Sequence, residues 1–456
     1  MMHPNEASQS PSSNAASSPP RPAYLRPQYV DQFQCIGSAC EDTCCEGWSV
    51  PIDQATYEKY VTIEAMKPHL GTVIVLNSEG VKPSDFARIR TTARACFFLD
   101  EERLCTIQKQ HGPSLLSSTC ATYPRSLTNS SGVEERSLTL SCPEAARVTL
   151  LHGNLLGSSQ ATSPKRYATI FQEIARFQQQ AEPGADSALS TADPLGYDPL
   201  LATREFALLL LTDRSYPLWQ RLLILGTVTR QLQTLSQGRS QAIFAAENPA
   251  VIAQLLADSA AVVSQGKLRA AMDAIQLRPA EQLPNILDLL RLRVAQPNLS
   301  PRFLECLQDL ENGLGSASPV SEAQLLATFA DAYRSYLRPL LDRHPQLLEN
   351  YLVNYVFRTN YPFGRPVDQP PSEDAVDASN QHMLLCVQLG ILQTMLVGMA
   401  AHYREAFECT HVVKLVQSLA KTFEHSRSSL RQITTFVAQR DLNNLRGIAL
   451  LLKPSD

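Results

Sequence analysis

The sequence lacks the short motifs that identify several common enzyme classes. Its Gly-x-Gly pattern, which starts at Gly313, has no third glycine and follows no expected strand, so a Rossmann dinucleotide loop is not indicated. The letters "GKL" from Gly266 do not complete a phosphate-binding P-loop, and no H-E-x-x-H stretch marks a zinc peptidase. The chemistry of this chain therefore has to be sought elsewhere in the sequence.

A strong excess of charge is also missing. Forty Lys and Arg residues stand against forty-four Asp and Glu residues, which gives a formal net charge of −4. Nucleic-acid-binding proteins usually carry a clear basic excess, so no nucleic-acid partner is expected. The length of 456 residues and the apolar fraction of 44% are sufficient for a soluble globular protein with one large or two ordinary domains.

An export signal and a membrane span are not expected. Residues 1–22 contain six Ser, five Pro and a single Arg, Arg21, and this composition predicts a disordered tail. The longest apolar run, "MLLCVQLGILQTMLVGMA", carries Gln388, Gln393 and Thr394, which favours a buried helix over a membrane span. We therefore expect a protein of the reducing cytoplasm with no membrane partner. In that compartment clustered thiols bind metal more often than they form disulfides.

Cysteine is abundant and unevenly placed. Four cysteines occur within eleven positions of "CIGSACEDTCC", residues 35–45, and eight of the eleven cysteines precede residue 143. The polar stretch "SSQATSPK" at 158–165 marks the expected boundary, after which the pattern becomes helical. We expect a tail at 1–22, a cysteine-cluster metal-binding module at 23–157 and a helical domain at 165–456.

Local patterns predict a mainly α fold, with a small cysteine-rich α+β module followed by a large all-helical region. Asp53 is placed to cap a helix over "QATYEKYV", and "RACFFLDEERLCTI" resembles a hairpin that brings two cysteines together. A strand is expected over "RSLTLSC", ending at Cys142. Leucine and valine at steps of three and four over 218–235 and 412–423 predict amphipathic helices.

The clustered cysteines predict metal binding. Thiolates suit zinc and iron, and a tetrahedral site or a four-iron cluster needs four such ligands. If the segment is helical, Cys40 and Cys44 share one face and Cys45 points about a quarter turn away, so adjacent cysteines are expected to serve different partners. Two metal sites, or one cluster with auxiliary thiols, would both fit. The expected metal-site residues are Cys35, Cys40, Cys44, Cys45, Cys96, Cys105, Cys120 and Cys142.

Other interpretations of the cysteines stay open. Disulfides are an alternative for the clustered eight, and the spacing alone does not choose between zinc and iron. Cys306, Cys386 and Cys409 occur singly on helical stripes, so we expect them to be ordinary core residues. A thiol redox sensor would need exposed cysteines of low pKa.

Several longer stretches carry a family resemblance. They are "YVDQFQCIGSACEDTCCEGWSVPIDQATYEKY", "ACFFLDEERLCTIQKQHG", "TCATYPRSLT", "ERSLTLSCPEAAR", "REFALLLLTDRSYPLWQRLLILG" and "ENYLVNYVFRTNYPFG". Together they resemble the flagellin lysine-N-methylase family, which is itself similar to a broad class of proteins proposed to chelate zinc or iron through cysteine clusters. The resemblance covers essentially the whole chain after the tail.

The resemblance implies an activity and cofactors. The family is described as transferring methyl groups from S-adenosylmethionine to the ε-amines of flagellin lysines, and an iron-sulfur cluster is attributed to its members. It implies iron ahead of zinc at the eight cysteines and leaves open which four are ligands. Another lysine-bearing protein is an alternative substrate, and the oligomeric state is not predicted. A non-catalytic metal-binding or cluster-carrier module is the alternative function.

Catalytic residues are not predicted by the sequence. The radical motif C-x3-C-x2-C fails because its third position is Gly47, so polar displacement by the lysine nitrogen is the simpler mechanism. Residues that adjoin the cysteines are weak candidates for an adenosyl or lysyl pocket, although such aromatics often only pack and such charges are often solvated. These candidates are Trp48, Tyr123, Arg125, Glu144 and Arg147.

Overall fold

The computed structural model describes most of the chain. The described residues are 24–25, 27–78, 82–92, 95–130, 133–153, 199–236, 249–295, 299–315, 321–364, 377–423 and 427–454. The expected tail at 1–22 and the expected boundary at 158–165 lie outside these residues.

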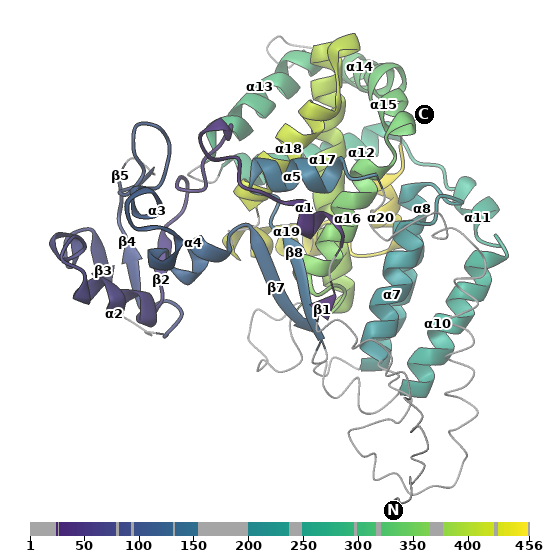
Figure 1. The fold of residues 1–456 in the computed structure, drawn as a ribbon. Coiled ribbons are helices and arrows are strands. Elements are labelled where there is room, and N and C mark those ends of the chain that lie inside the picture. The colour runs from purple at the N-terminus through teal and green to yellow at the C-terminus, as the bar shows by residue number, and fades with distance from the viewer. Residues whose placement is uncertain are drawn as a thin grey trace, which may run out of the picture.

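The strands form three small sheets in the first part of the chain (Figure 1). In the first sheet β8 lies between β1, to which it is parallel, and β7, to which it is antiparallel; in the second, β4 lies between β2 and β3. The third sheet is the pair β5 and β6. The strands are β1 (Tyr24–Leu25), β2 (Val50–Ile52), β3 (Ile74–Leu76), β4 (Ala87–Ile89), β5 (Thr91–Thr92), β6 (Ala95–Cys96), β7 (Arg125–Ser130) and β8 (Val133–Leu138).

Short helices connect these strands. The expected cap is confirmed, because the Asp53 carboxylate accepts a hydrogen bond from the Thr56 backbone N–H at 2.9 Å at the start of α2. The helices are α1 (Tyr29–Gln32), α2 (Gln54–Thr62), α3 (Thr106–His111), α4 (Ser118–Thr122) and α5 (Pro143–Leu150), with 3₁₀ turns η1 (Gly37–Ala39), η2 (Lys67–His69) and η3 (Pro113–Leu115).

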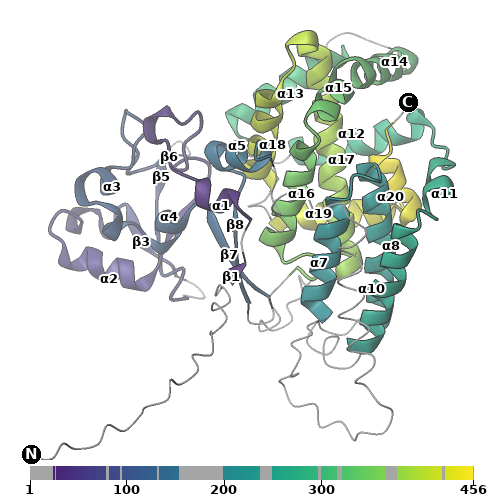
Figure 2. The ribbon, with the colours of Figure 1, turned by 45° about the vertical axis from the view of Figure 1, so that its right-hand side comes forward.

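A small hydrophobic core lies under the second sheet. Ile52, Tyr60, Ile74 and Ile89 are buried there, and burial alternates along β2 and β4 as one-sided sheet packing requires. This core is separate from that of the long helices. Both views place β2–β4, α2 and α3 to one side of the long helices, with β7, β8 and α5 between the two (Figures 1 and 2).

The remaining described chain is helical, as expected. The predicted stripes over 218–235 and 412–423 lie on α8 and α18. The helices are α7 (Pro199–Leu211), α8 (Leu218–Ser236), α10 (Pro249–Ser264), α11 (Arg269–Asp273), α12 (Pro279–Val294), α13 (Pro301–Leu314), α14 (Glu322–Ala332), the π-helix η4 (Tyr333–Leu337), α15 (Arg338–Arg343), α16 (Gln346–Thr359), α17 (Ala378–Tyr403), the 3₁₀ turn η5 (Arg404–Ala406), α18 (Cys409–Phe423), α19 (Arg427–Gln439) and α20 (Leu445–Leu452).

Helix α17 forms the centre of this region. It contains no Asp, Glu, Lys or Arg and packs against α8, α12, α13, α14, α18 and α20. A helix that is apolar on all sides is stable in water only when it is surrounded by protein. In the described residues it is the one helix long and apolar enough to cross a membrane, and 89% of its apolar window is buried. The expected buried helix is therefore confirmed.

The Gly-x-Gly pattern serves helix packing. A Cβ at Gly313 on α13 would lie 1.9 Å from the Gly398 carbonyl oxygen on α17, so glycine is required where these two helices approach closely. Gly315 has a φ of +73° and ends α13 in the left-handed conformation. Close helix packing therefore explains Gly313, and the left-handed end of α13 explains Gly315.

Two local expectations need correction. The strand predicted over "RSLTLSC" ends at Leu138, and Cys142 instead precedes α5, because Pro143 fits the first turn of a helix and cannot donate to a strand ladder. The hairpin expected around "DEER" is confirmed in part. Leu99 pairs with Cys105 across that turn, whereas Cys96 pairs with Thr91.

Buried polar contacts join β8 and α5 to the long helices. The Asn354 amide on α16 donates to the Leu138 carbonyl at 2.9 Å, and the Asn350 amide donates to the Thr149 carbonyl at 2.9 Å. Arg204 on α7 forms a salt bridge with Glu135 on β8, and both side chains are only 3% exposed. Buried charges of this kind are stable only while both partners are present.

We predict that R204M lowers the free energy of unfolding by about 3–5 kcal/mol, because the Glu135 carboxylate would be left buried and unpaired. Denaturant unfolding of the full chain measures this. The control is R291M, which breaks an exposed pair with Asp288 and should cost less than about 1 kcal/mol. Equal effects of the two variants would contradict the importance of the Arg204–Glu135 pair.

Candidate functional site

Five thiols line one cavity at the edge of the small core. We call it the cysteine cavity, with a volume of about 50 Å³. It is walled by Trp48, Tyr60, Phe98, Ser117 and Tyr123 together with further apolar side chains. The five cysteines come from four separate stretches of chain and are Cys44, Cys45, Cys96, Cys105 and Cys120.

Short-range structure holds each thiol segment in place. The Cys96 backbone N–H donates to the Cys45 carbonyl at 2.7 Å, which ties β6 to the loop that carries Cys44 and Cys45. Cys105 precedes the first turn of α3. Cys120 lies in α4, where its backbone N–H donates to the capping Ser117 hydroxyl at 3.3 Å. These contacts bring segments far apart in the sequence to a common cavity.

The helix assumed for residues 40–45 is absent. Only Gly37–Ala39 form a helical turn, Cys40 is extended, and the following residues to Gly47 lie outside regular helix. As a result Cys44 and Cys45 both line the cysteine cavity, and helix geometry does not separate them. The physical reason is that contacts from other segments, rather than helix periodicity, fix this loop.

Contacts among the thiols and their burial give the five cavity cysteines different pKa values. Interaction with the Cys45 thiol lowers the pKa of Cys44 to about 7 and that of Cys105 to about 6. Because Cys45 has a single proton that it shares with Cys105 and Cys44, its own pKa lies far above its usual value. Burial raises the pKa of Cys96 to about 11 and that of Cys120 to about 12. Cys44 and Cys105 are therefore the thiols closest to the thiolate form, which is the form that binds metal.

Three of the eight N-terminal cysteines do not line the cavity. Cys142 lies at the start of α5, and burial raises its pKa to about 12, with a smaller contribution from the charge of Cys40. The Cys40 thiol donates to the Asp42 carbonyl at 3.0 Å, and Cys35 is exposed. The eight cysteines predicted from the sequence therefore include all five cavity thiols and three that lie outside the cavity lining.

The donor set of the cavity suits a thiophilic metal. Five sulfurs are more than the four that zinc or an iron-sulfur cluster requires, and the low pKa values of two of them favour the ligating form. Among the described residues, no three His, Cys, Asp or Glu side chains are already arranged as a metal ligand set. The residues thus fit a metal in chemical type and number, without a closed ligand geometry.

Two of the weak pocket candidates reach the cavity. Trp48 and Tyr123 both line it, with ring centroids 6.2 Å apart, and the Trp48 indole N–H donates to the Cys44 carbonyl at 2.8 Å. Arg125 instead lies over the Phe33 ring, with its guanidinium carbon 5.1 Å from the centroid. It is not among the residues that line the cavity.

The two charged candidates pair with each other beside Cys142. We call residues 40–47 the cysteine loop. Arg147 on α5 forms salt bridges with Glu144 and with Glu41 of this loop. Neither Glu144 nor Arg147 lines the cysteine cavity. Their arrangement forms a contact between α5 and the cysteine loop.

Sequence reasoning missed the residues of α18 that contact the cysteine loop. Lys421 and Gln417 both donate to the buried Asp42 carboxylate, at 2.7 and 2.8 Å. Asp42 is separated from these residues by more than 370 positions, at 379 and 375 respectively. No local pattern signals such a pairing. The one available signal is the acidic pair Glu41 and Asp42 inside the cysteine cluster.

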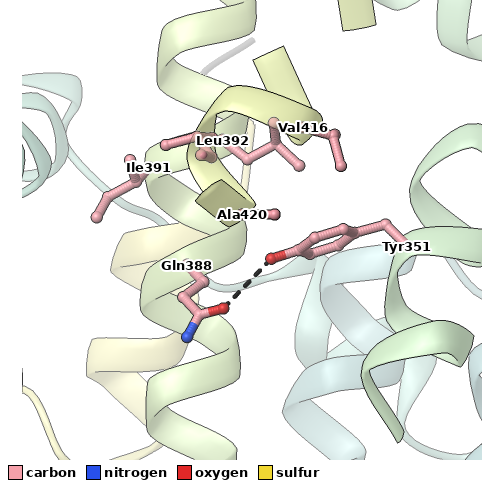
Figure 3. A pocket seen from close by; sticks show the side chains of 7 residues that line it. Tyr351, Gln388, Ile391, Leu392, Val416 and Ala420 are labelled. Atoms are coloured by element: carbon pink, nitrogen blue, oxygen red, sulfur yellow. Dashed lines mark hydrogen bonds between the residues drawn. The ribbon is translucent and has the colours of Figure 1, made fainter. Parts of the chain in front are cut away.

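A second pocket lies on another face of α18. It has a volume of about 20 Å³ and is bounded by α16, α17 and α18 (Figure 3). Its lining is apolar except for Tyr351 and Gln388, and the Tyr351 hydroxyl donates to the Gln388 amide oxygen at 3.3 Å. A pocket of this size with so few polar groups offers little to orient a ligand.

The other three cysteines are structural. Cys306 and Cys386 are fully buried in the helical core, as expected, and burial raises the pKa of Cys306 to about 11. Cys409 is half-buried at the start of α18 and packs against the same core.

The fold and the site together define a protein in which a cysteine-rich α+β module packs against a large helical region. Residues 204–451, more than half of the chain, match the family described as the FliB lysine N-methylase C-terminal domain. The chain therefore belongs to the FliB lysine N-methylase family, and the family resemblance read from the sequence is confirmed. No solved structure matches.

Curated relatives agree with this family. A protein named "Lysine-N-methylase" from Salmonella choleraesuis (strain SC-B67) is 33% identical over 138 residues, 30% of this chain and 34% of the relative. Its namesake from Salmonella typhimurium is 32% identical over the same length. The chain thus spans about a third of the length of these two relatives. The "Flagellar biosynthetic protein FliU" of Salmonella muenchen is 30% identical over 146 residues, 32% of this chain and 86% of that relative.

We predict that mild oxidation of chelator-treated protein with diamide links Cys105 to Cys45, because these two thiols lie within hydrogen-bonding reach of each other. Peptide mapping of the unreduced protein identifies the linked segments. Cys306 and Cys386 should stay unlinked as internal controls. Recovery of Cys105 only as a free thiol, under conditions that oxidise other cysteines, would contradict the shared cavity.

Proposed function

We propose that this chain is an S-adenosylmethionine-dependent protein-lysine N-methyltransferase that acts on flagellin or another lysine-bearing protein. Membership of the lysine N-methylase family supports the reaction, and the flagellar name of one relative supports the substrate. The single observation that supports this location of the site is the gathering of five thiols and four aromatic rings around one cavity. The proposed compartment is the cytoplasm.

The cysteine cavity is the proposed site of an iron-sulfur cluster, with zinc as the alternative metal. Four of the five cavity thiols would serve as ligands, and Cys35, Cys40 and Cys142 would be auxiliary. A bound metal would neutralise part of the charge of its thiolate ligands and would link the separate cysteine segments. In the chain itself, the single proton of Cys45 is shared with Cys44 and Cys105, which lowers the pKa of both neighbours.

The proposed reaction is a polar displacement. The lone pair of a neutral lysine Nζ attacks the sulfonium methyl carbon, the carbon–sulfur bond breaks with its electrons going to sulfur, and the new alkylammonium releases a proton. A free lysine has a pKa near 10.4 and is charged at pH 7, so it must lose a proton before it can attack. The apolar and aromatic walls of the cavity would favour the neutral amine by desolvation.

The proposed aromatic site for the cationic groups is formed by Trp48 and Tyr123. Their rings lie 6.2 Å apart at an interplanar angle of 30°, and both face the cysteine cavity. A methylsulfonium or methylammonium cation is attracted to the faces of such rings. Burial raises the pKa of Tyr123 well above its usual value, so this ring stays neutral at physiological pH.

The proposed activity predicts methyl incorporation. Full-length protein, purified and reconstituted anaerobically with iron and sulfide, should bind S-adenosylmethionine in calorimetry and transfer labelled methyl groups to flagellin or to another lysine-bearing protein. Mass spectrometry of the product locates the methyllysine. Protein that takes up metal yet neither binds S-adenosylmethionine nor methylates any substrate would instead indicate a non-catalytic metal-binding module.

The same assays test the aromatic pair. W48L should weaken S-adenosylmethionine binding or slow methyl transfer about tenfold, because it removes one cation–π partner. R125Q is the matched control, since Arg125 stacks on Phe33 outside the cavity lining, and it should leave both quantities unchanged. Equal losses in the two variants would count against a binding role for Trp48.

Metal binding makes a further prediction. C105S should lose most of the bound metal, because it removes the cavity thiol with the lowest pKa, whereas C386S should retain it. Elemental analysis gives metal per chain, and absorbance at the blue end of the visible spectrum distinguishes iron-sulfur from colourless zinc. Full metal content in C105S would remove Cys105 from the ligand set.

A further inference from the structure

The cysteine loop carries a buried carboxylate whose partners lie in the helical region. Asp42 lies between Cys40 and Cys44 and is 8% exposed. Its Oδ1 accepts a hydrogen bond from the Lys421 Nζ at 2.7 Å, and its Oδ2 accepts one from the Gln417 Nε2 at 2.8 Å. A carboxylate that is buried in this way requires such partners, so the loop is fixed to α18 at this residue.

The same two side chains also bind backbone carbonyls of cysteine-bearing segments. Lys421 Nζ donates to the Thr43 carbonyl at 3.1 Å, directly before Cys44. Gln417 Nε2 donates to the Ser141 carbonyl at 2.9 Å, directly before Cys142. One face of α18 therefore holds two of the segments that carry the N-terminal cysteines.

The two partners are themselves held rigidly. Gln417 and Lys421 are four residues apart on α18, so they project from one face of the helix. Gln417 is fully buried, and its amide oxygen accepts a hydrogen bond from the Arg302 Nε on α13 at 2.9 Å. Both ends of this amide are thus satisfied, and its orientation is determined by α13.

We propose that Gln417 and Lys421 are positioning residues of the cysteine site, which set where the loop places Cys44 and Cys45 and where the turn at Ser141 places Cys142. The inference deepens the proposed function and rests on it for the metal. Residues that hold the ligands of a metal site commonly change its affinity 10–100-fold when they are removed.

A second lysine on the same helix, whose salt-bridge partner lies on α13, provides a comparison. Lys414 also lies on α18 and forms a salt bridge with Glu305 at 2.8 Å, away from the cysteine segments. If the Asp42 contacts only stabilised the fold, substitutions of Lys414 and Lys421 would have similar consequences at the cysteine loop. If they position the loop, only Lys421 and Gln417 would affect it.

The first test measures the loop without metal. In chelator-treated full-length K421M, amide hydrogen exchange in peptides that span residues 40–48 should be about tenfold faster or more than in the wild-type protein, because the loop loses its fixed point. K421R should retain most of the protection, and K414M should match the wild type. Combining K421M with Asp42→Asn avoids an unpaired buried charge if the single variant does not fold.

The second test measures metal affinity by competition with a chelator. K421M and Q417L should bind metal about 10–100-fold more weakly than the wild type, K421R should recover part of this loss, and K414M should show no change. Circular dichroism and thermal unfolding of each variant confirm that the helical region is intact.

The two tests separate the inference from the proposed function. Unchanged exchange at 40–48 in both K421M and Q417L overturns the positioning role, whatever the activity of the enzyme. A wild-type protein that takes up no metal and transfers no methyl group, but whose loop exchanges faster in K421M, supports the positioning role while it removes the proposed function.

Discussion

The loop that carries Cys40, Cys44 and Cys45 lies outside regular helix and strand after Ala39, so its shape has to be imposed by its surroundings. On one side the Cys96 backbone N–H holds the Cys45 carbonyl, and on the other α18 holds the buried Asp42. The cost of burying a carboxylate makes the second contact obligatory, because an unpaired charge at that position would destabilise the folded chain. The positions of Cys44 and Cys45 follow from these two fixed points.

The contact at Asp42 is one part of a larger polar junction. Asn354 and Asn350 of α16 bind backbone carbonyls of β8 and α5, and Arg204 pairs with Glu135. Each of these groups is buried and satisfied by a partner from the other part of the chain. Apolar packing alone would tolerate small shifts between the module and the helices, whereas directional hydrogen bonds allow one arrangement. The central helix α17 supplies the rigid support behind this junction.

The family match and the cysteine cavity lie in different parts of the chain. The family match covers the helical residues 204–451, while the cavity thiols all lie before residue 143. The loop that carries Cys44 and Cys45 therefore contacts the family-defining helical region through α18. In the proposed enzyme, the helical region would act on the reaction by positioning the cysteine loop as well as by its own surfaces.

The sequence by itself determined several of the local elements of the structure. Helical periodicity over 218–235, the Asp53 cap and the uncharged run of α17 are local signals, and each corresponds to an element of the structure. The concentration of cysteine before residue 143 pointed to all five cavity thiols, although these thiols lie at 44–45, 96, 105 and 120 and are brought together only by the fold.

Only the tertiary structure decided which thiols share a cavity and what holds them. Cys44 and Cys45 face the same space because the loop is not helical, and Asp42 meets Lys421 across 379 positions of sequence. Pairing at such a separation leaves no periodic trace along the chain. It depends on how α13, α17 and α18 pack, and that packing is a property of the whole helical region rather than of any one segment.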